Sequence, residues 1–317
     1  MAHSSSSMTF GTLFIAVCAC RPVGAGATES AASEPAPATV APAKPSPPDP
    51  RQPTKLIEIT RGTFRMGDDD GTARERPAHD VQVATFYLEE HEVTAAQYLA
   101  CVEAQKCTPP GEKGNYGGLK MDKGTPELLD LGCTGYDPAR LGHPITCVDW
   151  NQAEAYCAWI GRRLPTEEEW EYAARGPASR TFVWGEDESL EQGGANTRDQ
   201  AFARWAESRH IDRGGAKQDD GYPLTAPPKK FPRDVTPEGV FDLAGNVTEW
   251  TSSNYCSYRE AKCSTYEKVA RGFAWDSAHA LPASSRGGVA PHVSLGAIGL
   301  RCAQTQSHTL DQRRDLR

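Results

Sequence analysis

The stretch Gly161-Arg-Arg-Leu-Pro-Thr-Glu-Glu-Glu-Trp-Glu-Tyr-Ala-Ala-Arg-Gly176 carries the most complete helix signal of the chain. Thr166 is followed three residues later by Glu169, which is the spacing of a capping box at a helix N-terminus. Trp170 and the alanines after it fall on one face, and Gly176 supplies the stop. The stretch therefore predicts a short helix that packs a tryptophan into a core, directly after an Arg-Leu-Pro segment.

Shorter signals around this helix predict a mixed fold. Leu56-Ile-Glu-Ile-Thr60 alternates like a strand, and residues 81–88 are predicted to form another. Thr94-Ala-Ala-Gln97 is a second capping box, and a further helix is expected to start near Asp149. After Gly176 the chain shows little periodicity, and loops of such length need disulfides, metals or a function to hold them.

Composition agrees with a loop-rich domain. The chain has 317 residues, of which 29 are Gly and 24 are Pro, while only 38% are hydrophobic, and this balance argues against a helical bundle. The formal net charge of −8 argues against a general binder of nucleic acid, which needs a basic face. No apolar run approaches the length of a transmembrane helix.

The N-terminal part predicts an exported protein. Residues 1–23 are predicted to be a signal peptide or lipoprotein leader, because a short apolar stretch ends in Val17-Cys-Ala-Cys20, and Cys20 is the expected lipidation site. No Lys or Arg precedes that stretch, so an unprocessed N-terminus is the alternative. Residues 24–54 are rich in Pro and Ala and are predicted to form a disordered linker. A globular domain over 55–305 and a disordered tail over 306–317 follow. This organisation suits a cell-envelope lipoprotein anchored to a membrane, or else a secreted or periplasmic protein.

Several blocks carry a family pattern. They are Gly62-Thr-Phe-Arg-Met-Gly67, residues 143–150, the Arg-Leu-Pro-Thr-Glu sequence, Gly239-Val-Phe-Asp-Leu-Ala-Gly-Asn-Val-Thr-Glu-Trp250 and Gly299-Leu-Arg-Cys302. In this order they resemble the formylglycine-generating enzyme (sulfatase-modifying factor) domain family. The resemblance implies a single irregular α+β domain of the C-type-lectin-like type, with little regular secondary structure and disulfide bonds as staples.

The same resemblance implies two structural calcium sites. Each combines two side chains with two backbone carbonyls, and these are oxygen ligands that Ca²⁺ prefers. The implied ligands are Asn196, Thr197, Asp220 and Tyr222 at the first site and Asp242, Gly245, Val247 and Glu249 at the second, where Thr197, Tyr222, Gly245 and Val247 contribute carbonyls. On the alternative interpretation, Asp242 and Glu249 only cap and solvate a loop.

The chain departs from the family where the family binds copper. Formylglycine-generating enzymes hold Cu(I) with two active-site cysteines, and soft thiolates suit that ion. Alignment of the blocks places Ser277 and Pro282 at these positions, and no cysteine lies between residues 271 and 286. A family serine and a family tryptophan are replaced by Ala274 and Thr248. Copper is therefore not expected.

Eight cysteines remain after the leader, and their even number predicts disulfide bonds. The resemblance implies a bond between Cys157 and Cys302. For the other six, proximity in the sequence favours the pairs Cys101–Cys107, Cys133–Cys147 and Cys256–Cys263 among the pairings that six cysteines allow. The competing interpretation is a free reactive thiol at Cys256 or Cys263.

Three functions stay open. A non-catalytic binding or scaffold module at the cell envelope would recognise an unidentified protein or glycan through residues 111–149 and 276–292. A formylglycine-generating oxidase would need non-standard ligands. A non-haem iron oxidoreductase would draw on Asp276, His279 and His292. The missing thiols favour the binding module, so no catalytic residue is predicted.

Overall fold

The computed structural model describes Asp49 and residues 51–190, 194–211, 214–215, 217–260 and 263–306. These residues belong to one compact unit that spans Pro48–Arg317. The predicted leader with Cys20, nearly all of the linker and the tail from residue 307 lie outside the described residues. In the part of the chain that the structure describes, no helix has the length and apolar character needed to cross a membrane.

Capping boxes fix the start of the three longest helices. In each, the N-cap side chain accepts a backbone N–H three residues on, and the side chain at that position accepts the N-cap N–H in return. Two of the boxes, Thr94 with Gln97 and Thr166 with Glu169, are those predicted from the sequence, and the third pairs Asp149 with Gln152. The helices are α1 (Ala95–Glu103), α3 (Trp150–Trp159) and α4 (Glu167–Arg175).

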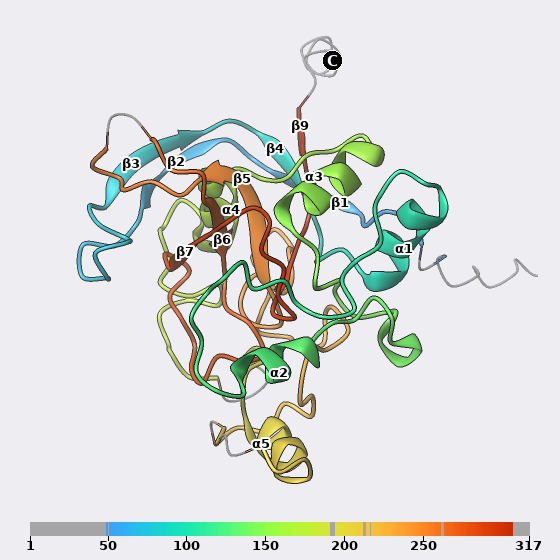
Figure 1. The fold of residues 1–317 in the computed structure, drawn as a ribbon. Coiled ribbons are helices and arrows are strands. Elements are labelled where there is room, and N and C mark those ends of the chain that lie inside the picture. The colour runs from blue at the N-terminus through green and yellow to red at the C-terminus, as the bar shows by residue number, and fades with distance from the viewer. Residues whose placement is uncertain are drawn as a thin grey trace, which may run out of the picture. The chain divides into compact units, whose positions relative to one another are not determined.

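The prediction of one strand over residues 81–88 is wrong. Two strands occupy this region, and the chain changes sheet between them at Thr85, whose hydroxyl accepts the N–H of Arg61 at 3.0 Å. Strand β2 (Gly62–Met66) pairs with β3 (His79–Val83) as a hairpin. The other sheet has the order β1-β4-β9 and is antiparallel throughout (Figure 1); its strands are β1 (Leu56–Ile59), β4 (Phe86–Glu89) and β9 (Ala303–Thr305).

A third sheet lies in the region where the sequence shows little periodicity. Its order is β7-β6-β5-β8, with β5 parallel to β8 and the other neighbours antiparallel. The strands that pair in this sheet are separated by loops in the sequence, so a local sequence pattern does not predict which strands pair. The strands are β5 (Thr248–Asn254), β6 (Lys268–Arg271), β7 (Arg286–Val289) and β8 (Ile298–Gly299).

Short helical elements also escape the sequence patterns. They are α2 (Thr125–Asp130), the 3₁₀ helix Pro138–Arg140 and α5 (Gln200–Glu207). The Asp199 side chain caps α5 by accepting backbone N–H groups of the first turn of the helix. Phe202 lies on the inner face of α5 and is fully buried. Helices α2 and α5 share one hydrophobic cluster with Trp275. The outcome is an α+β domain with short elements and long loops, as predicted.

Candidate functional site

The residues at the family's copper position lie in a tight turn after β6. The Ser277 N–H donates to the carbonyl of Ala274 at 2.9 Å, and the Ser277 carbonyl accepts the N–H of Arg198 at 2.8 Å. Pro282 follows in the same loop and is half-buried. Neither a hydroxyl nor a pyrrolidine ring is a soft ligand. This turn therefore offers no donor suited to Cu(I).

All cysteines of the described residues are paired. Four disulfide bonds join Cys101 to Cys107, Cys133 to Cys147, Cys157 to Cys302 and Cys256 to Cys263. The same pairs follow from the resemblance and from sequence proximity, and Cys256 and Cys263 are therefore not free thiols. Because a disulfide sulfur is no thiolate, the residues present do not fit a copper ion held by cysteines.

The three candidate iron ligands do not form a site. Asp276 and His279 lie in the turn region after β6, whereas His292 lies beyond β7, where its carbonyl accepts the side-chain amide of Asn115 at 2.9 Å. Among the residues that the structure describes, no group of three or more His, Cys, Asp or Glu side chains is arranged to hold a metal ion. The calcium sets differ from such a group, because each relies on two side chains and two carbonyls.

The first predicted calcium set is assembled around Asp220. Its carboxylate accepts the N–H of Thr197 at 3.0 Å and that of Tyr222 at 2.7 Å. Asn196, next to Thr197, is fully buried, and its side-chain oxygen has no hydrogen-bond partner among the described residues. Burial raises the pKa of Asp220 to about 7. The Asn196 amide oxygen and the Asp220 carboxylate are both of the kind that Ca²⁺ takes as ligands.

The two acidic side chains of the second predicted calcium set differ in how many of their oxygens are already hydrogen-bonded. Glu249 is fully engaged, because its carboxylate accepts the Arg301 guanidinium at 2.7–2.9 Å and the indole N–H of Trp170 at 2.7 Å. Asp242 accepts the N–H of Lys229 at 2.6 Å through one oxygen, while its other oxygen is buried without a partner in the described structure. Burial raises the pKa of Asp242 to about 6.

More buried acid surrounds Asp242 than the sequence indicated. Glu92 and Asp234 are both fully buried, and burial together with the neighbouring Asp242 raises the pKa of each well above its ordinary value. One Glu92 oxygen has no partner in the described part of the chain. Arg301 is the guanidinium in contact with this cluster, and it bonds Glu249. The raised pKa values mean that Glu92 and Asp234 hold their protons while no metal cation is nearby, and the charge of Arg301 is matched by Glu249.

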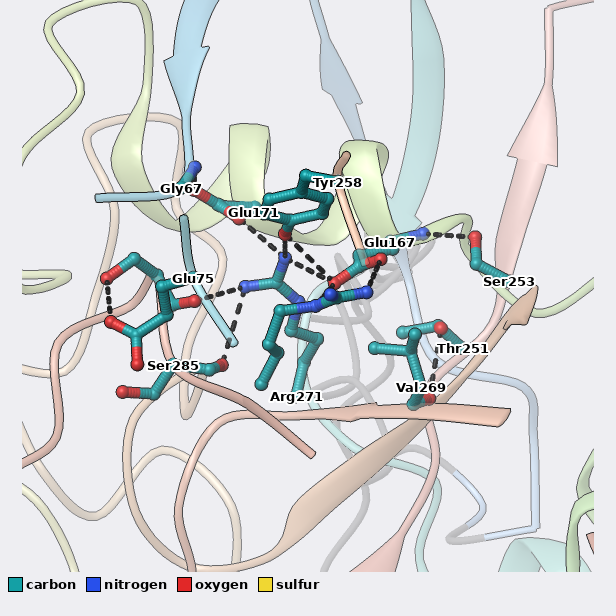
Figure 2. A network of polar contacts seen from close by, with 12 residues as sticks. Gly67, Glu75, Glu167, Glu171, Thr251, Ser253, Tyr258, Val269, Arg271 and Ser285 are labelled. Atoms are coloured by element: carbon teal, nitrogen blue, oxygen red, sulfur yellow. Dashed lines mark hydrogen bonds and ion pairs between the residues drawn. The ribbon is translucent and has the colours of Figure 1, made fainter. Parts of the chain in front are cut away.

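A second charged network lies under α4 and was not found from the sequence. Figure 2 shows the Arg271 guanidinium between Glu167, Glu171 and Tyr258. It donates to both carboxylates at 2.6 Å and to the tyrosine oxygen at 2.9 Å. Burial alone would lower the pKa of Arg271, but the two carboxylates outweigh it and raise the pKa.

Two further arginines balance the charge of this network. Arg286 binds Glu167 through two hydrogen bonds of 2.6 and 2.8 Å, and Arg175 binds Glu171 at 2.6 Å. The cluster joins α4 to β6 and β7. Because every carboxylate in it is bound by arginine, we assign the network a structural role.

A cleft of about 500 Å³ opens beside the N-terminal end of α3. Residues 106–115 and 147–155 form most of its lining, and His292 and Ser294 complete it. The lining thus includes parts of both predicted recognition segments, 111–149 and 276–292. Its volume lies in the range of small-ligand sites.

Exposed apolar side chains gather in the first recognition segment. Of the six large hydrophobic residues that are exposed in the described structure, four lie between residues 111 and 149. They are Leu119, Leu131, Tyr136 and Leu141, with exposed fractions of 50%, 39%, 53% and 38%. Exposed apolar surface on a pinned loop is typical of an interaction site.

The chain matches a known domain family and several of its members. The model of the sulfatase-modifying factor enzyme 1-like domain matches residues 42–306. Inactive C-alpha-formylglycine-generating enzyme 2 of Bos taurus is 30% identical over 80% of this chain and 88% of its own length. Formylglycine-generating enzyme of Mycobacterium tuberculosis is 32% identical over 64% of this chain and 75% of its own.

Solved structures show the same fold. PvdO from Pseudomonas aeruginosa superposes with a TM-score of 0.56 at 26% identity, covering 80% of this chain and 95% of that one. Variable protein 1 of Treponema denticola superposes equally well, with a TM-score of 0.56 over 79% of this chain and 95% of that one, although only 18% of residues are identical. The fold is therefore shared at low sequence identity.

Proposed function

Because this chain belongs to the sulfatase-modifying factor enzyme 1-like domain family, we propose that it uses the family fold as a non-catalytic binding module. The observation that carries the proposal is the loss of both copper-binding thiols at Ser277 and Pro282, with every cysteine of the described residues held in a disulfide. The chain is similar both to a protein named as an inactive formylglycine-generating enzyme and to one named as a formylglycine-generating enzyme. The similarity alone therefore does not decide between catalysis and binding, and the residues at positions 277 and 282 carry the argument.

The binding surface in this proposal is the segment of residues 111–149 with the cleft beside α3. The exposed side chains of Leu119, Leu131, Tyr136 and Leu141 support a protein partner. The Cys133–Cys147 bond links two points within this segment, and the Cys101–Cys107 bond constrains the residues just before it. A recognition loop held in one conformation loses less entropy on binding.

We expect no formylglycine production by this protein. Purified chain supplied with Cu(I) and a cysteine-containing sulfatase peptide should consume no oxygen above the no-enzyme rate, because all the cysteines of the described domain are held in disulfide bonds and no thiolate there can bind the metal. The Mycobacterium tuberculosis formylglycine-generating enzyme, assayed in parallel, is the positive control. Copper-dependent oxygen uptake with conversion of the peptide cysteine would disprove the non-catalytic role.

Calcium is the cation that we propose for the two acidic sets. Support comes from the unpartnered buried oxygens of Asn196 and Asp242, one in each set. At a calcium concentration a hundredfold above Kd, one site bound only by the folded state adds about 2.7 kcal/mol of stability. Thermal unfolding with and without EGTA should therefore show a lower Tm in the chelator.

The variant Asp220→Asn tests the first site, because it removes the carboxylate from the set. Its matched control is Asp219→Asn, since Asp219 is exposed and pairs instead with Arg204 at 2.8 Å. We expect the first variant to lose part of the calcium response and the second to keep it. An equal response of both variants would rule out the first site.

Export to the cell envelope is also part of the proposal. Four disulfide bonds support an oxidising compartment, where such bonds persist. The leader sequence and Cys20 support a lipid anchor. Fractionation of cells that express the full chain, compared with Cys20→Ala, tests the anchor: release of the variant from the membrane fraction supports it, and equal distribution contradicts it.

A further inference from the structure

The cleft beside α3 carries positive charge that the described structure does not neutralise. Lys106 and Lys113 line it, both are exposed, and neither forms an ion pair with a described residue. The only acid of the lining is Asp149, whose carboxylate caps α3 and accepts the Gln152 N–H at 2.9 Å, so the lining holds two ammonium groups against one carboxylate. In a chain with a net charge of −8, this is a local exception.

The walls of the cleft are built from three segments that bind one another. The Gln152 side chain donates to the Thr108 hydroxyl at 2.9 Å and to the carbonyl of Pro109 at 2.8 Å. Asn115 and Ser294 exchange backbone hydrogen bonds of 2.8 and 2.9 Å. These bonds tie the wall together without using the ammonium groups of Lys106 and Lys113. A wall fixed in this way is pre-organised for a ligand.

An aromatic side chain stands next to the cleft. The Tyr136 hydroxyl donates to the carbonyl of Pro110, a lining residue, at 3.2 Å, while 53% of the tyrosine remains exposed. Tyrosine offers a rigid apolar surface with a polar tip, and it is enriched at binding interfaces. The cleft and its neighbour therefore combine two cations with one exposed ring.

We propose that this cleft binds an acidic peptide segment of a partner protein. Carboxylates of the segment meet Lys106 and Lys113, and an adjoining apolar side chain packs on Tyr136. A volume of about 500 Å³ accommodates more than a single ion, and the two lysines favour an anionic occupant over a neutral one. The inference rests on the proposed binding function and names the chemistry of its partner.

Fluorescence anisotropy with a fluorescein-labelled hexaglutamate peptide tests the site. We expect saturable binding that weakens as salt is added, and no binding of a hexaglutamine peptide. The variant Lys106→Gln/Lys113→Gln should bind hexaglutamate about tenfold more weakly, since two ion pairs of partly exposed charges are lost. The matched control is Lys120→Gln/Lys123→Gln, which removes two exposed lysines of the same segment outside the lining.

Three outcomes would overturn the site. They are unchanged affinity of Lys106→Gln/Lys113→Gln, an equal loss in the control variant, and full displacement of the peptide by inorganic phosphate at the same charge concentration, which would indicate recognition of the anion alone. Thermal unfolding of all variants confirms that they are folded. The result is independent of the oxygen-uptake assay: turnover there would remove the non-catalytic role, whereas failure here would remove only the acidic-peptide assignment.

Discussion

Replacing Glu171 with glutamine is expected to lower the free energy of unfolding by about 3–5 kcal/mol, because removal of one partner leaves buried charges uncompensated. The Glu171 carboxylate is fully buried and accepts Arg271 and Arg175, each at 2.6 Å, and the N–H of Gly67 at 2.8 Å. Glutamine keeps the shape but removes the negative charge that both guanidinium groups share. Urea unfolding followed by tryptophan fluorescence measures the change.

Glu168→Gln is the matched control for this prediction. Glu168 lies on the same helix and undergoes the same chemical change, but it forms no ion pair among the described residues. We expect its effect to stay within about 0.5 kcal/mol, as for other surface substitutions. Equal effects of the two variants would show that helix α4 tolerates the loss of either charge and that the network under it is not a source of stability.

Removal of the Cys157–Cys302 disulfide is expected to have an effect of similar size. This bond closes a loop with a sequence separation of 145, and the chain-entropy relation gives about 4–5 kcal/mol for a loop of that length. Both sulfurs are fully buried between α3 and the segment before β9. The variant Cys157→Ala/Cys302→Ala should therefore unfold at a much lower denaturant concentration under oxidising conditions.

A short loop provides the comparison. The Cys256–Cys263 bond has a sequence separation of 7, so its removal as Cys256→Ala/Cys263→Ala is expected to cost about 2–3 kcal/mol. The difference between the two double variants combines the effect of loop length with the loss of buried packing at Cys157 and Cys302, because Cys256 is half-buried and Cys263 is exposed. If the short-loop variant lost as much stability as the long-loop variant, loop closure would not explain the stabilisation.

Local signals were readable in the sequence, whereas long-range partners were not. The capping boxes at Thr94 and Thr166 were predicted because donor and acceptor lie three residues apart. Residues 81–88 were predicted as one strand because alternation continues through Thr85, although the partner strand changes there. Asp199 is a residue type favoured at a helix N-cap, but the eight residues of α5 are too few to show a clear helical repeat of apolar side chains.

In the candidate site, too, features that depend on local sequence were predicted, whereas contacts between distant segments were not. The loss of the copper thiols at Ser277 and Pro282 follows from the aligned sequence blocks alone. Glu167 and Glu171 lie one turn apart on α4, yet Arg271 is distant in the chain and nothing in the sequence connects it to them. The cleft depends on three separated segments, which only the folded chain brings together.

The long disulfide also changes what a single peptide-bond cleavage can do. Residues 208–210, after α5, are exposed and lie between Cys157 and Cys302. A protease that cuts there would leave two polypeptides joined by one covalent bond. The smaller piece would still supply β9, paired with β4 beside Cys302, and it could not diffuse away. After such a cut, the Cys157–Cys302 bond and not the main chain would hold the two parts of the domain together.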